Sequence, residues 1–314
     1  MEKIENKEFS GERSQYFAHD LNYDKCLFKE GESCLKHTKN IIIENTIFDY
    51  KYPLWICENV LVKKSHFNEK AKSGLWYVKN FRLEDSLVEA PKEFRRSSGI
   101  KLINVNFTNA VETLWTCSNV KMKNVKARGD YFAMNSKKIY ADNLELEGNY
   151  FLDGAENIEI HNSHLVSKDA FWNCKNVTVY DSYIWGEYLG WHSKNLKFVN
   201  CTIESNQGLC YVDGLVMKNC TLVNTDLAFE YSRRINADIK SSIVSVKNPC
   251  GGKIKAMEIE TLILNPARCN VKSTKIICDK ITNVYSKDPN ANENDFLEMP
   301  LMQFILGKKN GIRF

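Results

Sequence analysis

Three acidic residues recur in similar short segments of the chain, and two carboxylates close to one glycosidic bond could act as acid and base. Asp130, Asp169 and Glu187 stand in GDYF, SKDAF and GEYL. A pair about 5 Å apart suits a retaining glycosidase, and a pair about 6.5–9.5 Å apart suits an inverting one. A lyase would instead use a base such as Lys168, with acidic residues holding Ca²⁺. Asp130, Asp169, Glu187 and Lys168 are therefore the candidate catalytic residues, and the reaction stays open.

Aromatic residues accompany these carboxylates at the same spacing. Rings that stack on the apolar faces of sugars, beside polar groups that bond hydroxyls, suit an oligosaccharide or polysaccharide partner. Two arginines in this set are further candidates for the base of a lyase. The predicted substrate-binding residues are Trp115, Tyr131, Trp172, Tyr188, Trp191, His192, Tyr211, Glu230, Arg95 and Arg96.

A short internal repeat must position these side chains. A turn-like residue followed by an apolar residue, which we call the repeat junction, recurs from Asn40-Ile41 to Asn270-Val271 at intervals of 18 to 21 residues. After each junction apolar residues alternate, as in VTVYDSYI (177–184), which is the period of a strand. Such a repeat has no room for the helices of a helical solenoid.

The fold predicted from this repeat is all-β: a right-handed parallel β-helix of roughly thirteen coils of about 19 residues, with capped ends. The leucine-rich repeat is the nearest competitor, but its repeats are 20–29 residues long and its Asn falls one position later. We expect residues 1–20 to be an N-terminal cap, 21–285 the β-helix, and 286–314 a polar linker and C-terminal segment.

Fixed positions within the repeat predict where side chains point. Five residues past the junction, Asn predominates, as at Asn162, which predicts a buried ladder of amides at a bend. A second position, which we call the tryptophan column, holds Trp55, Trp76, Arg95, Trp115, Met134, Asp153, Trp172, Trp191, Cys210 and Glu230. The preceding position is apolar, and neighbours in a strand face opposite ways. We therefore expect the tryptophan column to face outward.

The eleven cysteines have no C-x₂₋₄-C spacing, so we assign them to the core as reduced thiols and expect no zinc site. No metal or other cofactor is predicted, except a divalent cation such as Ca²⁺ if the protein is a lyase. No nucleotide-binding motif is present.

Composition places the chain among soluble globular proteins. Its net charge of +4 is too small to imply a nucleic-acid partner, and no 18-residue apolar run predicts a membrane span. The N-terminal sequence lacks the apolar region of a signal peptide, so we expect a cytoplasmic protein.

Several segments resemble an uncharacterised bacterial domain-of-unknown-function family with a pectin-lyase-like, single-stranded right-handed β-helix. They include FSGERSQYF (9–17), GDYFAMNS (129–136), KDAFWNC (168–174) and GLCYVDGLVMKNC (208–220), and the resemblance extends over residues 5–285. It implies the fold and carries no established activity.

Two functions follow as hypotheses. The first is a carbohydrate-recognising β-helix, either a glycoside hydrolase or a polysaccharide lyase acting on oligosaccharides. The second is a non-catalytic scaffold whose aromatic face docks a protein partner or a second copy of the chain, so that a homodimer stays open.

Overall fold

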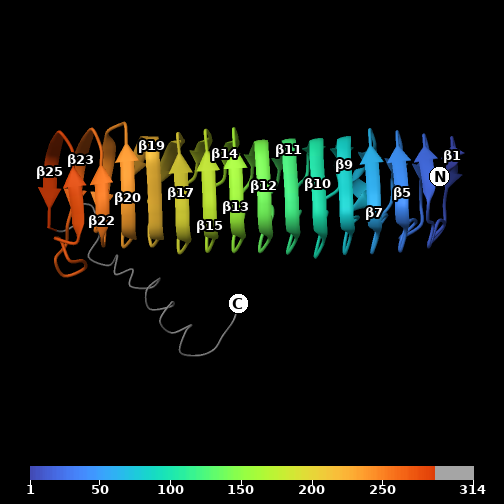
Figure 1. The fold of residues 1–314 in the computed structure, drawn as a ribbon, viewed down its shortest axis with the longest axis horizontal. Helices are drawn as coiled ribbons and strands as arrows, with labels where there is room; N and C mark the ends of the chain where they lie inside the picture. The colour runs from blue at the N-terminus through green and yellow to red at the C-terminus, as the bar shows by residue number, and fades with distance from the viewer. Residues whose placement is uncertain (287–314) are drawn as a thin grey trace, which may run out of the picture.

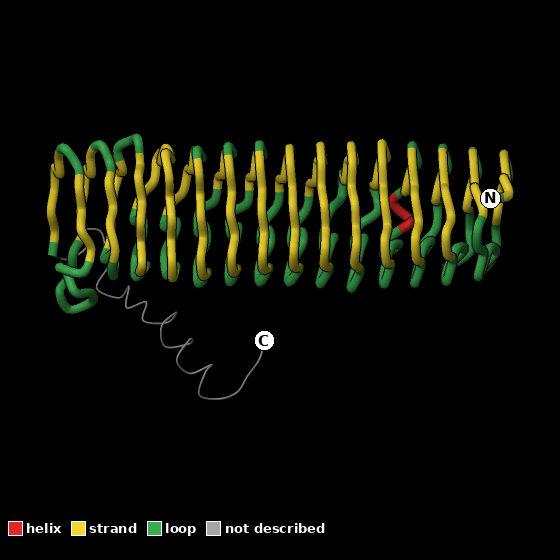
Figure 2. The backbone as a smooth tube through the Cα atoms, viewed as in Figure 1, coloured by secondary structure: helices red, strands yellow, loops and turns green. Residues whose placement is uncertain are grey.

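The computed structural model describes residues 1–286, and these residues wind into one parallel β-helix. Figure 1 shows the strands standing side by side in chain order from the N-terminus to the last coil. The tube trace in Figure 2 shows the loops joining each coil to the next. Strands in neighbouring coils lie about 4.8 Å apart, so the solenoid is on the order of 70 Å long.

One strand of every coil begins at or next to the position of the repeat junction, and these strands pair in parallel through the molecule. They are β1 (Glu2–Glu5), β3 (Leu21–Asp24), β5 (Lys39–Glu44), β7 (Glu58–Lys63), β9 (Lys79–Val88), β10 (Ser98–Phe107), β11 (Ser118–Arg128), β12 (Lys137–Glu147), β13 (Glu156–His161), β15 (Lys175–Tyr180), β17 (Lys194–Val199), β19 (Asp213–Asp226), β20 (Arg233–Ile239), β22 (Gly252–Lys255) and β24 (Thr274–Ile277).

A second row of strands follows the bend, and in β9 to β12 and β19 one continuous strand spans both rows. The separate strands of this row are β2 (Glu8–Phe9), β4 (Leu27–Phe28), β6 (Ile47–Phe48), β8 (His66–Phe67), β14 (His164–Val166), β16 (Tyr183–Trp185), β18 (Thr202–Asn206), β21 (Ile243–Lys247), β23 (Glu258–Ile263) and β25 (Lys280–Tyr285). Among the described residues the only helical turn is the 3₁₀ turn η1 (Glu69–Ala71).

The repeat period and the parallel β-helix are confirmed, but the number of coils is about 15, not thirteen. The two additional coils lie at the N-terminus, where β1 pairs with β3 and β3 with β5. Residues 1–20 are therefore the first coil of the same solenoid. At the other end, the last junction is at Thr274, because a loop over residues 265–273 displaces it from Asn270.

The core contains the apolar positions that the repeat predicts. Phe28, Phe48 and Phe67 stack in successive coils with ring centroids 5.2 and 4.6 Å apart, and all are at most 1% exposed. None of the eleven cysteines forms a disulfide, and nine of them are buried. Burial raises the pKa of the Cys57 thiol to about 11 and that of Cys117 to about 12, so these thiols are protonated core groups.

The asparagine ladder exists, but it faces solvent. Asn124 donates to Asn104 at 2.9 Å and Asn143 donates to Asn124 at 3.0 Å, and all three residues are exposed. Asn162 donates instead to Asp142 at 2.8 Å and is also exposed, so the expectation of a buried amide there is wrong. The column is polar because each of its residues has a left-handed backbone, which Asn tolerates best (φ 49° at Asn162).

Within residues 1–286, no helix has the length and apolar character of a membrane span.

Candidate functional site: an aromatic strip with a buried carboxyl group

The tryptophan column faces outward, as the alternation predicts. Leu54, Leu75 and Leu114 in the preceding position are fully buried, whereas the indoles of Trp55 and Trp115 are half-buried on the outside. Each of the five indoles in the column donates its Nε1–H to a backbone carbonyl in the following coil, at 2.5 to 2.8 Å. The indoles are thus fixed against the solenoid wall.

Stacking along the column covers many of the indole faces. The rings of Trp55 and Trp76 are parallel and 5.3 Å apart, and those of Trp172 and Trp191 are parallel and 5.7 Å apart. The guanidinium of Arg95 lies between Trp76 and Trp115, 4.6 Å from each ring centroid. Arg95 also pairs with Glu112 at 2.9 Å. It therefore acts as a member of the ladder, joined to its neighbours by cation–π contacts.

The ladder is interrupted for two coils, at Met134 and Asp153. Over this gap the rings of Tyr131 and Tyr150 stack in parallel, 4.8 Å apart. Tyr131 meets Trp115 edge to face, and Tyr150 meets Trp172 in the same way. We call Trp115, Tyr131, Tyr150, Trp172 and Trp191 the aromatic strip. Its centre is accessible, since Tyr131 is 36% exposed.

One position of the turn holds Tyr131, Tyr150, Asp169 and Tyr188 in four successive coils. Asp169 is 5% exposed, yet no group among residues 1–286 hydrogen-bonds its carboxyl group or forms an ion pair with it. Burial raises the pKa of Asp169, and the negative charges of Glu187 and Asp153 act in the same direction against the nearby Lys168 charge. A carboxyl group that is largely buried and has no protein partner is a candidate functional group.

Glu187, in the coil after Asp169, has the opposite environment. Hydrogen bonds from Tyr188 and from Lys168 lower the pKa of Glu187. The Lys168 ammonium lies 3.2 Å from the Glu187 carboxylate and 5.3 Å from the centre of the Tyr188 ring. Lys168 therefore pairs with Glu187 and leaves its chain neighbour Asp169 without a partner. Adjacent coils thus hold one carboxyl group that favours its proton and one that favours its charge.

Two further carboxylates complete this part of the surface. Asp130 accepts a hydrogen bond from the backbone of Asn149 at 2.8 Å and is half-buried. Asp153 lies in the gap of the tryptophan column and accepts the side-chain amide of Asn173 at 2.9 Å, while burial raises its pKa. Asp153 was not among the predicted site residues. Its signal was visible, because it is a carboxylate in a position that otherwise favours tryptophan.

The remaining predicted residues flank the strip. His192 stacks on Tyr211 with ring centroids 5.0 Å apart, and burial lowers the pKa of His192. Tyr211 in turn contacts Trp191 at 5.2 Å. Arg96 is exposed and lies three coils before Asp153, outside the gap.

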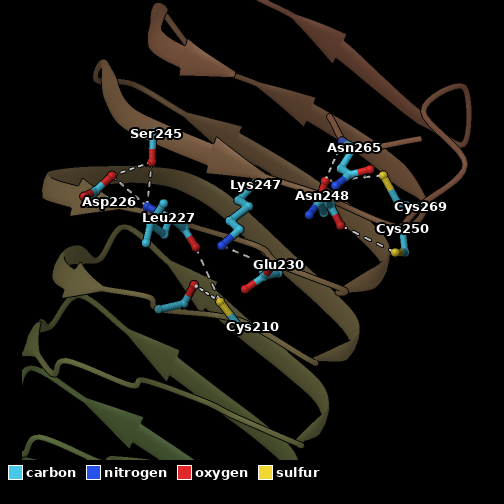
Figure 3. Close-up of polar contacts among 11 residues, drawn as sticks. Cys210, Asp226, Leu227, Glu230, Ser245, Lys247, Asn248, Cys250, Asn265 and Cys269 are labelled. Carbon is cyan, nitrogen blue, oxygen red and sulfur yellow. Dashed lines mark hydrogen bonds and ion pairs between the residues drawn. The ribbon is translucent and has the colours of Figure 1, made fainter. Parts of the chain in front are cut away.

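Glu230, at the far end of the tryptophan column, is separated from the strip by Cys210. Its carboxylate lies 3.5 Å from the Lys247 ammonium, and both side chains are at most 20% exposed. Figure 3 shows this pair between the Asp226–Ser245 contact and the group of Asn248, Cys250 and Cys269. This arrangement ties neighbouring coils together and lies apart from Asp169.

A surface groove lies on another face. It has about 960 Å³ and runs beside the asparagine ladder, where Lys126, Arg128, Glu145, Glu147 and His164 line it. Four of its charged side chains form ion pairs, Lys126 with Glu145 at 2.8 Å and Arg128 with Glu147 at 2.7 Å. None of the predicted site residues lines this groove. Across the described part of the chain, no three His, Cys, Asp or Glu side chains converge as metal ligands would.

The sequence of residues 2–277 matches the family model described as "Protein of unknown function (DUF3737)". The chain belongs to this family. The match confirms the resemblance to a family of unknown function, and no curated protein matches the sequence.

Solved structures with a similar backbone are distant. A tailspike protein of the E. coli bacteriophage HK620 has 8% identity and a TM-score of 0.43, over 90% of this chain and 72% of its own. The A-module of the mannuronan C-5 epimerase AlgE4 from Azotobacter vinelandii has 9% identity and a TM-score of 0.30, over 92% and 90%. PfbA, a surface adhesin of Streptococcus pneumoniae, has 10% identity and a TM-score of 0.28, over 86% and 70%. Similarity at this level says nothing about what this chain binds.

Proposed function

We propose that the protein binds a carbohydrate chain along the aromatic strip and hydrolyses a glycosidic bond beside Asp169. The observation that carries this proposal is the pairing of an unpartnered carboxyl group, only 5% exposed, with an ion-paired carboxylate one coil away. Aromatic rings flank both groups.

The strip suits an extended sugar chain in shape and in chemistry. From Trp115 to Trp191 it crosses four coil steps, which is on the order of 19 Å. Tyr131 offers an accessible ring at its centre, and the half-buried indoles offer edges and partial faces beside it. Asp130, Asp153 and Asn149 supply oxygen and amide groups for hydroxyls, as sugar recognition requires.

The two carboxyl groups divide the roles of a glycosidase between them. Asp169, whose pKa is raised, is the carboxyl group that gives its proton to the glycosidic oxygen as the bond to the leaving sugar breaks. Glu187, whose pKa is lowered, carries the negative charge that faces the positive charge developing on the sugar ring. A water molecule then supplies the hydroxyl that forms the new bond to the anomeric carbon, and its remaining proton returns to Asp169. Separation of the pKa values of two neighbouring carboxyl groups is the pattern that assigns an acid and a carboxylate partner.

Hydrolysis is favoured over the lyase reaction because the candidate bases are unsuited to it. The ion pair with Glu187 raises the pKa of Lys168, whereas a base near neutral pH needs a lowered one. Arg95 is held between two indoles, and Arg96 lies three coils before Asp153, outside the gap.

Binding is tested by calorimetry against a panel of neutral, cationic and anionic oligosaccharides. Tyr131→Ala removes an exposed ring of the strip, and Tyr140→Ala removes one of similar exposure (41%) on the strand face of β12. We expect Tyr131→Ala to weaken binding at least ten-fold, in line with the loss of about 1.4 kcal/mol of ring contact, and Tyr140→Ala to leave it unchanged. Equal effects of the two variants, or no binding to any sugar, would refute the proposal.

Hydrolysis is tested by following product release from the oligosaccharide that binds best. Asp169→Asn should abolish turnover and keep binding, because the amide has no acidic proton to donate. Turnover that survives in Asp169→Asn would remove the catalytic half of the proposal and leave a binding protein.

A second candidate, self-association, is favoured by a separate set of exposed apolar side chains over the first four coils. Phe17 is 60% exposed, Tyr16 is 40% exposed, and Ile56 and Tyr77 are each 39% exposed. Exposed apolar surface of this kind marks interaction surfaces. Sedimentation of the parent and of Phe17→Ser over a range of concentrations tests it: a parent that stays monomeric throughout would exclude a second copy as the partner.

A further inference from the structure

The charges around the aromatic strip select among carbohydrates. Four coils contribute the same turn to this surface, with the sequences DYFAMN (130–135), NYFLDG (149–154), KDAFWN (168–173) and EYLGWH (187–192). These turns hold the carboxyl groups Asp130, Asp153, Asp169 and Glu187, and their one lysine, Lys168, is ion-paired with Glu187. His192 adds no charge near neutral pH, because burial lowers its pKa.

The same turn has the opposite charge nearer the N-terminus. In three earlier coils it reads KYPLWI (51–56), KSGLWY (72–77) and PKEFRR (91–96), and its one acid, Glu93, is fully buried. The turn between the two groups, VETLWT (111–116), carries Glu112, which pairs with Arg95 and Lys92. The charged side chains of the turn are therefore mainly basic in these earlier coils, where Lys51 pairs with Glu32. At the strip, the carboxylates without an ion-pair partner among residues 1–286, apart from Asp169, are Asp130 and Asp153.

We propose that the ligand of the aromatic strip is an oligomer of amino sugars, which carries ammonium groups, and not a uronic-acid chain. This inference rests on the proposed carbohydrate-binding function and names its substrate class. A carboxylate on every sugar would meet Asp130 and Asp153 as like charges, and like charges across an interface are strongly unfavourable. An ammonium group would instead pair with them.

Asp130 and Asp153 are suited to this role because each uses one oxygen for the protein. Asp130 accepts from the Asn149 backbone, and Asp153 accepts from the Asn173 amide. The second carboxylate oxygen of each accepts no hydrogen bond from within residues 1–286. Substitution by Asn keeps an oxygen for the existing bond and removes only the charge.

The experiment compares the affinities of three oligomers of equal length: glucosamine, N-acetylglucosamine and galacturonic acid. Each partly exposed ion pair contributes a factor of about two to five. Two such pairs predict that the glucosamine oligomer binds about ten-fold more tightly than the N-acetylated one, with a difference that shrinks in high salt. The galacturonate oligomer should bind more weakly than either.

The double variant Asp130→Asn, Asp153→Asn should reduce the roughly ten-fold preference for the glucosamine oligomer over the N-acetylated one to about two-fold or less. The matched control is Asp142→Asn. The Asp142 carboxylate also accepts an Asn amide from a neighbouring coil, but it belongs to strand β12 and not to the turn that carries the strip. A preference that persists in the double variant, or galacturonate binding as tight as glucosamine binding, would overturn the inference and leave carbohydrate binding intact. Failure of all three oligomers to bind would overturn the inference as well, whereas the proposed function itself falls only if no oligosaccharide of the wider panel binds.

Discussion

Replacement of Arg95 by Met tests whether this arginine belongs to the wall of the solenoid. Its guanidinium lies 4.6 Å from both Trp76 and Trp115, and its side chain is 24% exposed. Met retains most of the apolar stem and can contact both rings, but it has no charge. The variant therefore removes two cation–π contacts and the ion pair with Glu112.

The expected loss of stability follows from these contacts. Each cation–π contact contributes about 0.5–1 kcal/mol at this exposure, and the ion pair about 0.5–1 kcal/mol. Against this gain stands the Nε of Arg95, which is buried and has no acceptor. Loss of an unsatisfied donor returns roughly 1 kcal/mol. Arg95→Met should thus lower the free energy of unfolding by about 1 kcal/mol.

The assay is urea unfolding followed by the fluorescence of the six tryptophans, which include Trp76 and Trp115. The matched control is Arg96→Met, at the next residue, which is exposed and has the same side-chain chemistry. We expect the control to remain within about 0.5 kcal/mol of the parent, as is usual for exposed positions. If both variants unfold at the same urea concentration, the guanidinium contributes nothing to the ladder, and Arg95 returns to the candidates for ligand binding.

Three further outcomes are expected. Burial raises the pKa of the fully buried Glu93, so the parent should lose stability as pH rises from the ordinary carboxyl range through this raised value, and Glu93→Gln should lose less in the same urea titrations. Hydrolysis should follow a bell-shaped pH profile, lost at low pH as Glu187 is protonated and at high pH as Asp169 ionises, and a rate that is flat across both limbs would contradict the assignment. Asn162→Leu should lower the free energy of unfolding by about 1–2 kcal/mol, because Leu is strained at φ 49°, whereas Asn162→Gly should lower it less.

The winding of the chain could be predicted because each coil repeats the same steric demands. The junctions and the asparagine column are positions of left-handed backbone, from Asn40 (φ 52°) to Asn219 (φ 52°), and few residue types tolerate that conformation. The first two coils were missed because Asp20 replaces Asn at the second junction and the first coil lacks such a residue. Their pairing through β1 and β3 obeys the same register as the rest.

The partners of each side chain could not be predicted from its position in the repeat. Asp169 and Glu187 are both acidic residues near one turn of the repeat, and their sequences give no reason to expect opposite pKa shifts. The difference arises because Lys168 reaches the next coil and pairs with Glu187. The role of Arg95 was likewise hidden, since a charged residue in an outward column gives no sign that two indoles enclose it.

The site lies where the columns change residue type, because in a uniform column each side chain finds its partners in the neighbouring coils. Asparagine amides bond to asparagines one coil away, and indoles stack on indoles, so a regular column offers a ligand few unsatisfied groups. Side-chain groups are left without such partners only where the residue type of the column changes. Asp153 interrupts the tryptophan column and Asp169 interrupts the tyrosine column, in consecutive coils. Two independent interruptions in consecutive coils leave an exposed ring, Tyr131, and an unpartnered carboxyl group, Asp169, within two coils of each other, which is why chemistry is expected there.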